Sequence, residues 1–128
     1  MTRVIIIGHG GYGSAVRRNL NMLVGEIEDF FYVDFDEKDD LVTLRGKVWD
    51  VLDGFGGEDV LFACDLAGSP FREVAVICSE HPNYCAVAGL NTAAYSEMSF
   101  NLELSASELC DLGCEVAASS ILRYPVKD

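Results

Sequence analysis

The sequence lacks the features of membrane, secreted and nucleic-acid-binding proteins. No apolar run approaches the roughly 20 residues that a helix needs to cross a bilayer. The apolar run in residues 1–8 is too short for a signal peptide and leads directly into a glycine-rich bend, so we interpret it as a strand. Basic residues are few: nine Lys and Arg stand against 21 Asp and Glu, a net charge of −12. Nucleic acid is therefore not expected as a partner, whereas partners with basic docking surfaces are favoured.

Paired cysteine motifs are also absent. The number of cysteines is odd and no C-x-x-C pair occurs, which favours reduced thiols in a cytosolic protein over a disulfide framework. Cys110 and Cys114 are spaced to share one face of a helix, but no histidine pair accompanies them. We expect neither a metal site nor a cofactor. The five cysteines are Cys64, Cys78, Cys85, Cys110 and Cys114.

What is present is an alternation of strand and helix signals along one domain, residues 1–128. β-branched and aromatic runs predict strands at 3–7, 30–35, 59–64 and 84–88. Apolar spacing and capping residues predict helices at 14–23, 41–52, 69–80, 92–101 and 105–119. This alternation predicts an α/β fold of three layers, helix, sheet and helix, around a mostly parallel sheet of four strands. Residues 121–124 have strand-like composition and are a candidate short C-terminal strand.

The carboxyl ends of parallel strands are where such a fold places its ligands. Three segments follow strands in this way: the glycine bend at 8–13, the turn at 65–70, and Gly-Leu-Asn at 89–91. The first carries a histidine, the second an aspartate before a helix, and the third an amide side chain. We expect the three to converge at one edge of the sheet.

His9 is the candidate nucleophile. It lies at the carboxyl end of a strand, and the glycines on either side leave its ring uncrowded. A histidine with an ordinary pKa near 6.5 is largely neutral at pH 7, so one ring nitrogen keeps a free lone pair that can attack phosphorus. The alternative is a histidine that merely occupies a bend.

Asp65 is the candidate partner of this histidine, because a carboxylate on one ring nitrogen would select the tautomer in which the other is free. The alternative for Asp65 is a capping or surface carboxylate. Ser69 is predicted as the N-cap of the following helix, with Pro70 at its first position. The N-terminus of that helix would offer backbone N–H groups to a phosphoryl group. The candidate phosphate-binding residues are Gly10, Gly68, Ser69, Phe71 and Arg72.

A second reading of the glycine bend is a nucleotide site. Gly8, Gly10 and Gly13 match G-x-G-x-x-G after a strand and before a helix, and Asp34 lies where a ribose hydroxyl would be bound. Against this, His9 occupies a position that is normally small or apolar, and Asp34 begins a cluster of carboxylates. The alternative function is therefore a Rossmann-like nucleotide-binding or regulatory domain that uses this loop.

Several motifs together resemble the enzyme IIA domain of the mannose-type branch of the bacterial phosphoenolpyruvate:sugar phosphotransferase system. The resemblance covers residues 3 to about 98. Its motifs are Ile-Ile-Gly-His-Gly-Gly at 6–11, Met-Leu-Val-Gly-Glu at 22–26, Val-Asp-Phe at 33–35, Asp65 with Gly-Ser-Pro-Phe-Arg at 68–72, and Ala-Gly-Leu-Asn at 88–91. The chain departs from the family pattern in a turn before Ser69 that is one residue shorter and in Thr-Ala-Ala-Tyr at 92–95.

The resemblance implies a cytoplasmic phosphotransferase that works through a phosphohistidine. In that family the histidine matching His9 accepts a phosphoryl group from the carrier HPr and passes it to an enzyme IIB, which serves the membrane subunits IIC and IID. The aspartate matching Asp65 hydrogen-bonds the histidine. The spelling of the motifs is most similar to members that serve N-acetylgalactosamine and related amino sugars. Family members pair through a C-terminal strand, so the resemblance also implies a homodimer.

Overall fold

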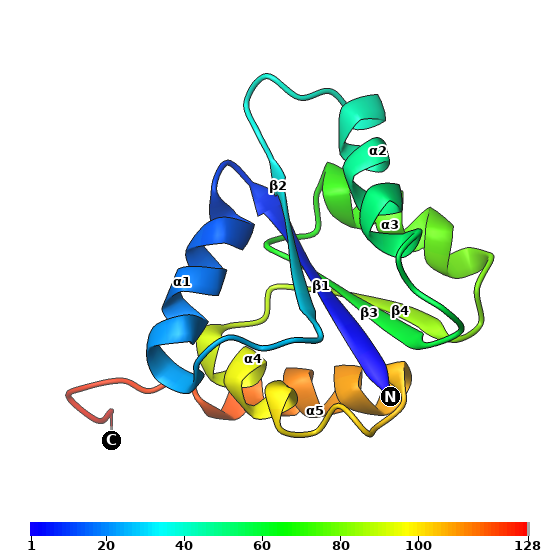
Figure 1. Cartoon of the computed structure of the whole chain (residues 1–128). Coiled ribbons are helices and arrows are strands. Elements are labelled where there is room, and N and C mark those ends of the chain that lie inside the picture. The colour runs from blue at the N-terminus through cyan, green and yellow to red at the C-terminus, as the bar shows by residue number, and fades with distance from the viewer. Residues whose placement is uncertain (128) are drawn as a thin grey trace.

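The sheet has four parallel strands. A computed structural model of the chain describes residues 1–127, and Figure 1 shows the arrangement of its elements. The strand order is β2-β1-β3-β4, so the first strand lies inside the sheet and the order reverses beside it. In register, His9 pairs with Phe35 and Ile7 pairs with Cys64. The strands are β1 (Thr2–His9), β2 (Phe30–Phe35), β3 (Asp59–Cys64) and β4 (Tyr84–Ala88).

Helices cover both faces of this sheet, which confirms the three-layer α/β prediction. One face carries α1 (Tyr12–Val24), α4 (Thr92–Ser99) and α5 (Ala106–Ser119). The other face carries α2 (Leu41–Leu52) and α3 (Ser69–Ser79). The connections between strands therefore pass on both sides of the sheet, as in other doubly wound folds.

The β1 strand explains why the sheet is covered on both faces. Val4 and Ile6 pack against the α1, α4 and α5 side, whereas Ile5 and Ile7 pack against the α2 and α3 side. All four are fully buried, because alternate side chains of a strand point to opposite faces. By the same alternation, His9 follows Ile7 toward the side of α2 and α3.

Helix termini agree with most of the capping signals. Asp40, Asn91 and Ser105 each cap a helix through the side chain, and Ser105 forms a capping box with Glu108. The prediction for α3 was wrong in its cap: Gly68 is the N-cap, Ser69 is already helical and its side chain makes no cap bond. Pro70 still fits the first turn, because an N–H there has no helical partner.

The C-terminal segment differs from its strand-like composition. Residues 121–127 form no strand in this single chain, and their apolar side chains are largely exposed. The candidate fifth strand is therefore not part of the sheet, which contains parallel pairs only. Over residues 1–127, no helix is both long enough and apolar enough to span a membrane.

Candidate functional site

His9 is the last residue of β1, and its side chain is 47 % exposed. The chain leaves the strand immediately after it, through Gly10 with φ at +60°. This left-handed conformation favours glycine, and no other atom crowds the position. The Gly10 N–H donates to the carbonyl of Phe35 at 2.8 Å, which fixes the bend against the end of β2.

Asp65 holds His9 by both its backbone and its ring. The Asp65 Oδ2 atom lies 2.9 Å from His9 Nδ1 and accepts a hydrogen bond from the His9 N–H at 3.0 Å. A carboxylate accepts hydrogen bonds, so the neutral imidazole beside it carries its proton on Nδ1. The lone pair of Nε2 is then free, and the structure brings together the two residues that the sequence singled out.

The carboxyl group of Asp65 stays ionised well into the acid range. Burial opposes its ionisation, but the hydrogen bonds from the backbone and ring of His9 and from the Leu66 N–H outweigh burial and lower the pKa of Asp65. A lowered pKa in the folded state stabilises the fold above the ordinary pKa of an aspartate. This contribution is lost only as the pH falls through the lowered value.

The first turn of α3 lies beside the imidazole. A methyl group on Gly68 would come within 3.7 Å of His9 Cε1, the ring atom between Nδ1 and Nε2. Within residues 1–127, the backbone N–H groups of Ser69 and Phe71 have no hydrogen-bond acceptor, as is usual for the first turn of a helix. The Gly68 N–H donates to the Leu66 carbonyl and that of Gly10 to Phe35, so these two glycines shape the site without offering a free donor.

Arg72 supplies positive charge near this turn. Its side chain lines a cavity of about 270 Å³ together with Ser69 and Leu41. The neighbouring Glu73 pairs with Arg45 at 3.0 Å, whereas in the part of the chain that the structure describes Arg72 makes no ion pair. Four features on the α3 side of His9 thus suit a phosphate: two N–H groups, a hydroxyl and a guanidinium.

The other side of His9 is aromatic and acidic, which the sequence analysis did not assign to the site. The ring of Phe35 lies 5.6 Å from the imidazole, centroid to centroid. Beyond it, a cavity of about 330 Å³ is lined by Asp36, Glu37 and Asp39 as well as by His9. Phe35 belongs to the Val-Asp-Phe motif, and its place opposite His9 in the register is the signal that could have identified it.

The glycine fingerprint is explained by packing. A Cβ on Gly13 would lie 2.9 Å from Asp34 Oδ1 and 3.3 Å from the Ile6 carbonyl, so glycine lets α1 approach the sheet. The Asp34 carboxylate accepts hydrogen bonds from the backbone N–H and the hydroxyl of Ser14. Asp34 is therefore engaged inside the fold, which argues against a role in binding a ribose.

Tyr12, at the start of α1, contacts Tyr95, the last residue of the Thr-Ala-Ala-Tyr segment that departs from the family pattern. Their hydroxyl oxygens lie 2.9 Å apart, and Tyr95 is fully buried in α4. The Tyr12 ring packs so closely on Gly8 that a Cβ there would lie 2.4 Å from it. Burial raises the pKa of both phenols, so they stay neutral, and the pair anchors the start of α1 to α4.

The remaining histidine and the cysteines lie outside this site. His81 stacks on Tyr84 at 4.4 Å near the start of β4, the opposite end of the strands from His9. All five cysteines are free, and burial raises the pKa of Cys64 to about 12. Over residues 1–127, no group of three His, Cys, Asp or Glu side chains could hold a metal ion.

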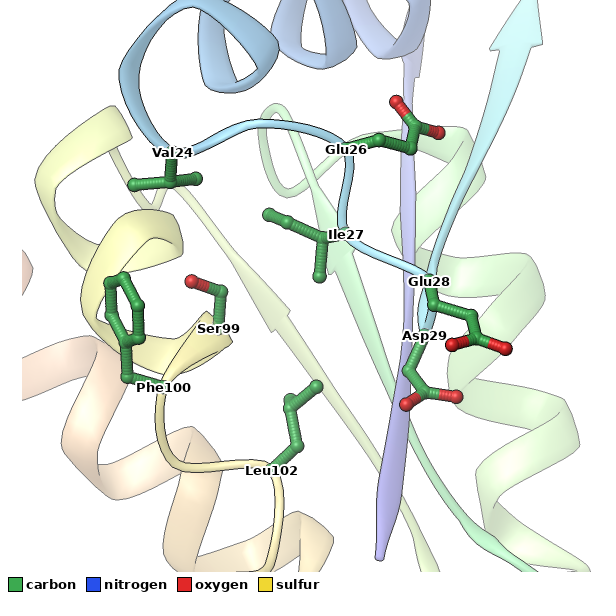
Figure 2. A pocket seen from close by; sticks show the side chains of 8 residues that line it. All are labelled: Val24, Glu26, Ile27, Glu28, Asp29, Ser99, Phe100 and Leu102. Atoms are coloured by element: carbon green, nitrogen blue, oxygen red, sulfur yellow. The ribbon is translucent and has the colours of Figure 1, made fainter.

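A second hollow lies at the amino ends of the strands. It has a volume of about 280 Å³ between the segment after α1 and the segment after α4. Figure 2 shows Ile27 and Leu102 pointing into this space, whereas the carboxylates of Glu26 and Glu28 point away from it. Its lining is half apolar and half polar or acidic, and it does not include His9.

In comparisons of sequence, the chain is similar to IIA components of the sugar phosphotransferase system (PTS). Residues 3–109 match the family model described as "PTS system fructose IIA component". The chain is 31 % identical over 93 residues to the fructose-specific EIIA component of Bacillus subtilis, covering 71 % of this chain and 64 % of that protein. It is 26 % identical over 108 residues to the sorbose-specific EIIA component of Lacticaseibacillus casei, covering 83 % and 78 %.

A IIA subunit is also among the solved structures with a similar fold. The mannose/sorbose specific IIA subunit from Enterococcus faecalis superposes with a TM-score of 0.89 at 23 % identity, over 99 % of this chain and 97 % of that one. At this identity the likeness concerns the fold. The chain spans slightly less than two thirds of the length of the fructose-specific relative.

Proposed function

Because this chain belongs to the family of phosphotransferase-system fructose IIA components, we propose that it carries a phosphoryl group on His9. The observation that supports this most is the Asp65 carboxylate on Nδ1, which leaves Nε2 free on a ring whose Cε1 atom lies beside Gly68, the N-cap of α3. No other histidine within residues 1–127 has a carboxylate partner, since His81 stacks on an aromatic ring instead.

The proposed step is a direct displacement at phosphorus. The Nε2 lone pair of His9 attacks the donor's phosphoryl group, and the bond between phosphorus and the donor breaks with its electron pair staying on the donor. The imidazole gains positive charge as the new bond forms, and the Asp65 carboxylate stabilises that charge. In this proposal the N–H groups of Ser69 and Phe71, the Ser69 hydroxyl and Arg72 bind the phosphoryl oxygens.

We propose HPr as the donor and an enzyme IIB as the acceptor, working in the cytoplasm with membrane subunits IIC and IID. The named relatives serve fructose and sorbose, so the amino-sugar preference stays a prediction. The net charge of −12 fits carrier proteins with basic docking faces, because opposite charges speed their encounter.

The direct test is incubation with phosphoenolpyruvate, enzyme I and HPr, followed by intact mass. We expect one phosphoryl group per chain, labile to acid and stable to base, on the wild type and on His81→Ala. His9→Ala should gain none, because the nucleophile is removed while the fold keeps its core. Labelling of His9→Ala at the wild-type rate would contradict the proposal.

We also propose a homodimer formed through the C-terminal segment. In this single chain β4 is an edge strand, and the apolar side chains of Ile121, Leu122 and Tyr124 are exposed. An unpaired edge and an exposed apolar segment would be covered together if two copies exchanged them. Light scattering should show a dimer for the full chain and a monomer for a chain that ends at Ser119. A monomeric full chain would contradict the proposal, and a dimeric shorter chain would place the interface elsewhere.

A further inference from the structure

The end of β2 is pinned to its surroundings on three sides. The Asp34 carboxylate accepts hydrogen bonds from Ser14, and the Asp34 carbonyl accepts one from Lys47 Nζ at 2.9 Å. The next carbonyl, of Phe35, accepts the Gly10 N–H at 2.8 Å. These contacts join α1, α2 and the histidine bend to one dipeptide, so the place of the Phe35 ring is set by three separate elements.

The Phe35 ring lies against the imidazole in a tilted contact. The centroids are 5.6 Å apart at an interplanar angle of 54°, a favourable arrangement for two aromatic rings. Asp65 holds the ring from the direction of β3, since β2 and β3 flank β1 on opposite sides. The imidazole therefore lies between the carboxylate of Asp65 and the ring of Phe35.

The two sides of the imidazole also differ in charge. The cavity on the Phe35 side is lined by the carboxylates of Asp36, Glu37 and Asp39, and Lys47 holds two of them, Asp36 at 3.2 Å and Asp39 at 2.6 Å. The α3 side has a helix N-terminus and Arg72. A phosphoryl dianion is repelled from the first side and attracted to the second.

From this arrangement we propose that Phe35 is a positioning residue for His9. Its ring keeps the imidazole turned so that Nδ1 stays on Asp65 and Nε2 is presented to the α3 side, from which the phosphoryl donor approaches. The effect on phosphoryl transfer rests on the proposed function of His9. The effect on the imidazole itself does not, so the two can be tested separately.

Phe31 provides a matched control. It lies on the same strand and, four residues earlier, on the same face, and it packs in the same core as Phe35. Its ring contacts Phe55 at 4.9 Å instead of His9. Phe31→Ala and Phe35→Ala should therefore lose similar amounts of packing, but only Phe35→Ala removes the contact with the imidazole.

The first experiment observes the imidazole nitrogens by ¹⁵N NMR in wild type, Phe31→Ala, Phe35→Ala and Phe35→Leu. We expect wild type and Phe31→Ala to show the Nδ1–H tautomer with Nε2 unprotonated. Phe35→Ala should show averaged nitrogen signals because the ring turns and its bond to Asp65 opens, and Phe35→Leu should restore much of the wild-type signal. Wild-type nitrogen signals in folded Phe35→Ala would overturn the proposal.

The second experiment measures phosphorylation of the same variants by phosphoramidate, a small donor that needs no protein docking, at equal folded fraction. Misplacement of a reacting atom is costly, so Phe35→Ala should react at least about tenfold more slowly than Phe31→Ala. Equal rates would overturn the role of Phe35 in transfer. If the wild type takes up no phosphoryl group from HPr either, the proposed function fails, and the NMR result still decides whether Phe35 positions the ring.

Discussion

The amino and carboxyl ends of the parallel strands use polar residues in opposite ways. At the amino ends of the strands, Arg3 forms ion pairs with Glu58 at 3.1 Å and Asp29 at 3.9 Å. Its guanidinium also lies over the rings of Phe31 and Phe55, at 5.8 and 4.7 Å from their centroids. At the carboxyl ends of the strands, His9 is half exposed and has one ring nitrogen free. The N–H groups of Ser69 and Phe71 nearby lack acceptors within residues 1–127.

This difference separates stability from chemistry. A charged group surrounded by partners contributes to folding and has no bond left to offer a ligand. A group held on one side only, such as the imidazole on Asp65, is oriented by the fold and still open to a reaction partner. The hollow at the amino ends of the strands has no such imidazole in its lining (Figure 2), although its volume is close to that of the cavity beside His9.

Among substitutions that test this contrast, Asp65→Asn is expected to have the largest effect, and that effect is on the rate of phosphoryl transfer. The amide can still contact the ring, but it selects the tautomer less strongly and does not stabilise positive charge on it, so transfer should slow by about tenfold or more. The measurement is the initial rate of phosphorylation by HPr, with folding checked by circular dichroism. An unchanged rate in a folded variant would assign Asp65 a structural role only.

Smaller effects are expected for Arg72 and Arg3, on the transfer rate for the first and on stability for the second. Arg72→Met should slow transfer by about 2- to 5-fold, equivalent to ~0.5–1 kcal/mol, and leave thermal unfolding unchanged. Arg3→Met should lower the free energy of unfolding by about 1–2 kcal/mol through its lost ionic and cation–π contacts, and leave the transfer rate unchanged. Denaturant unfolding and phosphorylation rates on both variants check this. A changed transfer rate in Arg3→Met, or a changed stability in Arg72→Met, would contradict this contrast between the two ends of the strands.

Local patterns in the sequence predicted the elements well. Continuous apolar runs such as residues 4–7 can only be buried on both faces, and the capping box at Ser105 is a contact between residues three apart. The α3 cap was misplaced by one residue, because Gly68 and Ser69 are both acceptable there and the turn after Asp65 decides between them. The strand at 121–124 was predicted from composition alone, and it has no partner strand within residues 1–127.

The sequence by itself determined the order of strands and helices, the covered sheet, and the candidate pair His9 and Asp65, because each follows from neighbouring residues or from the rule that ligands lie at the carboxyl ends of parallel strands. Only the tertiary structure decided which ring nitrogen Asp65 holds, that Asp34 is engaged by Ser14, and that Phe35 faces His9. These pairs are 20 to 56 residues apart along the chain. Their contacts depend on strand order and register, which many distant side chains set together.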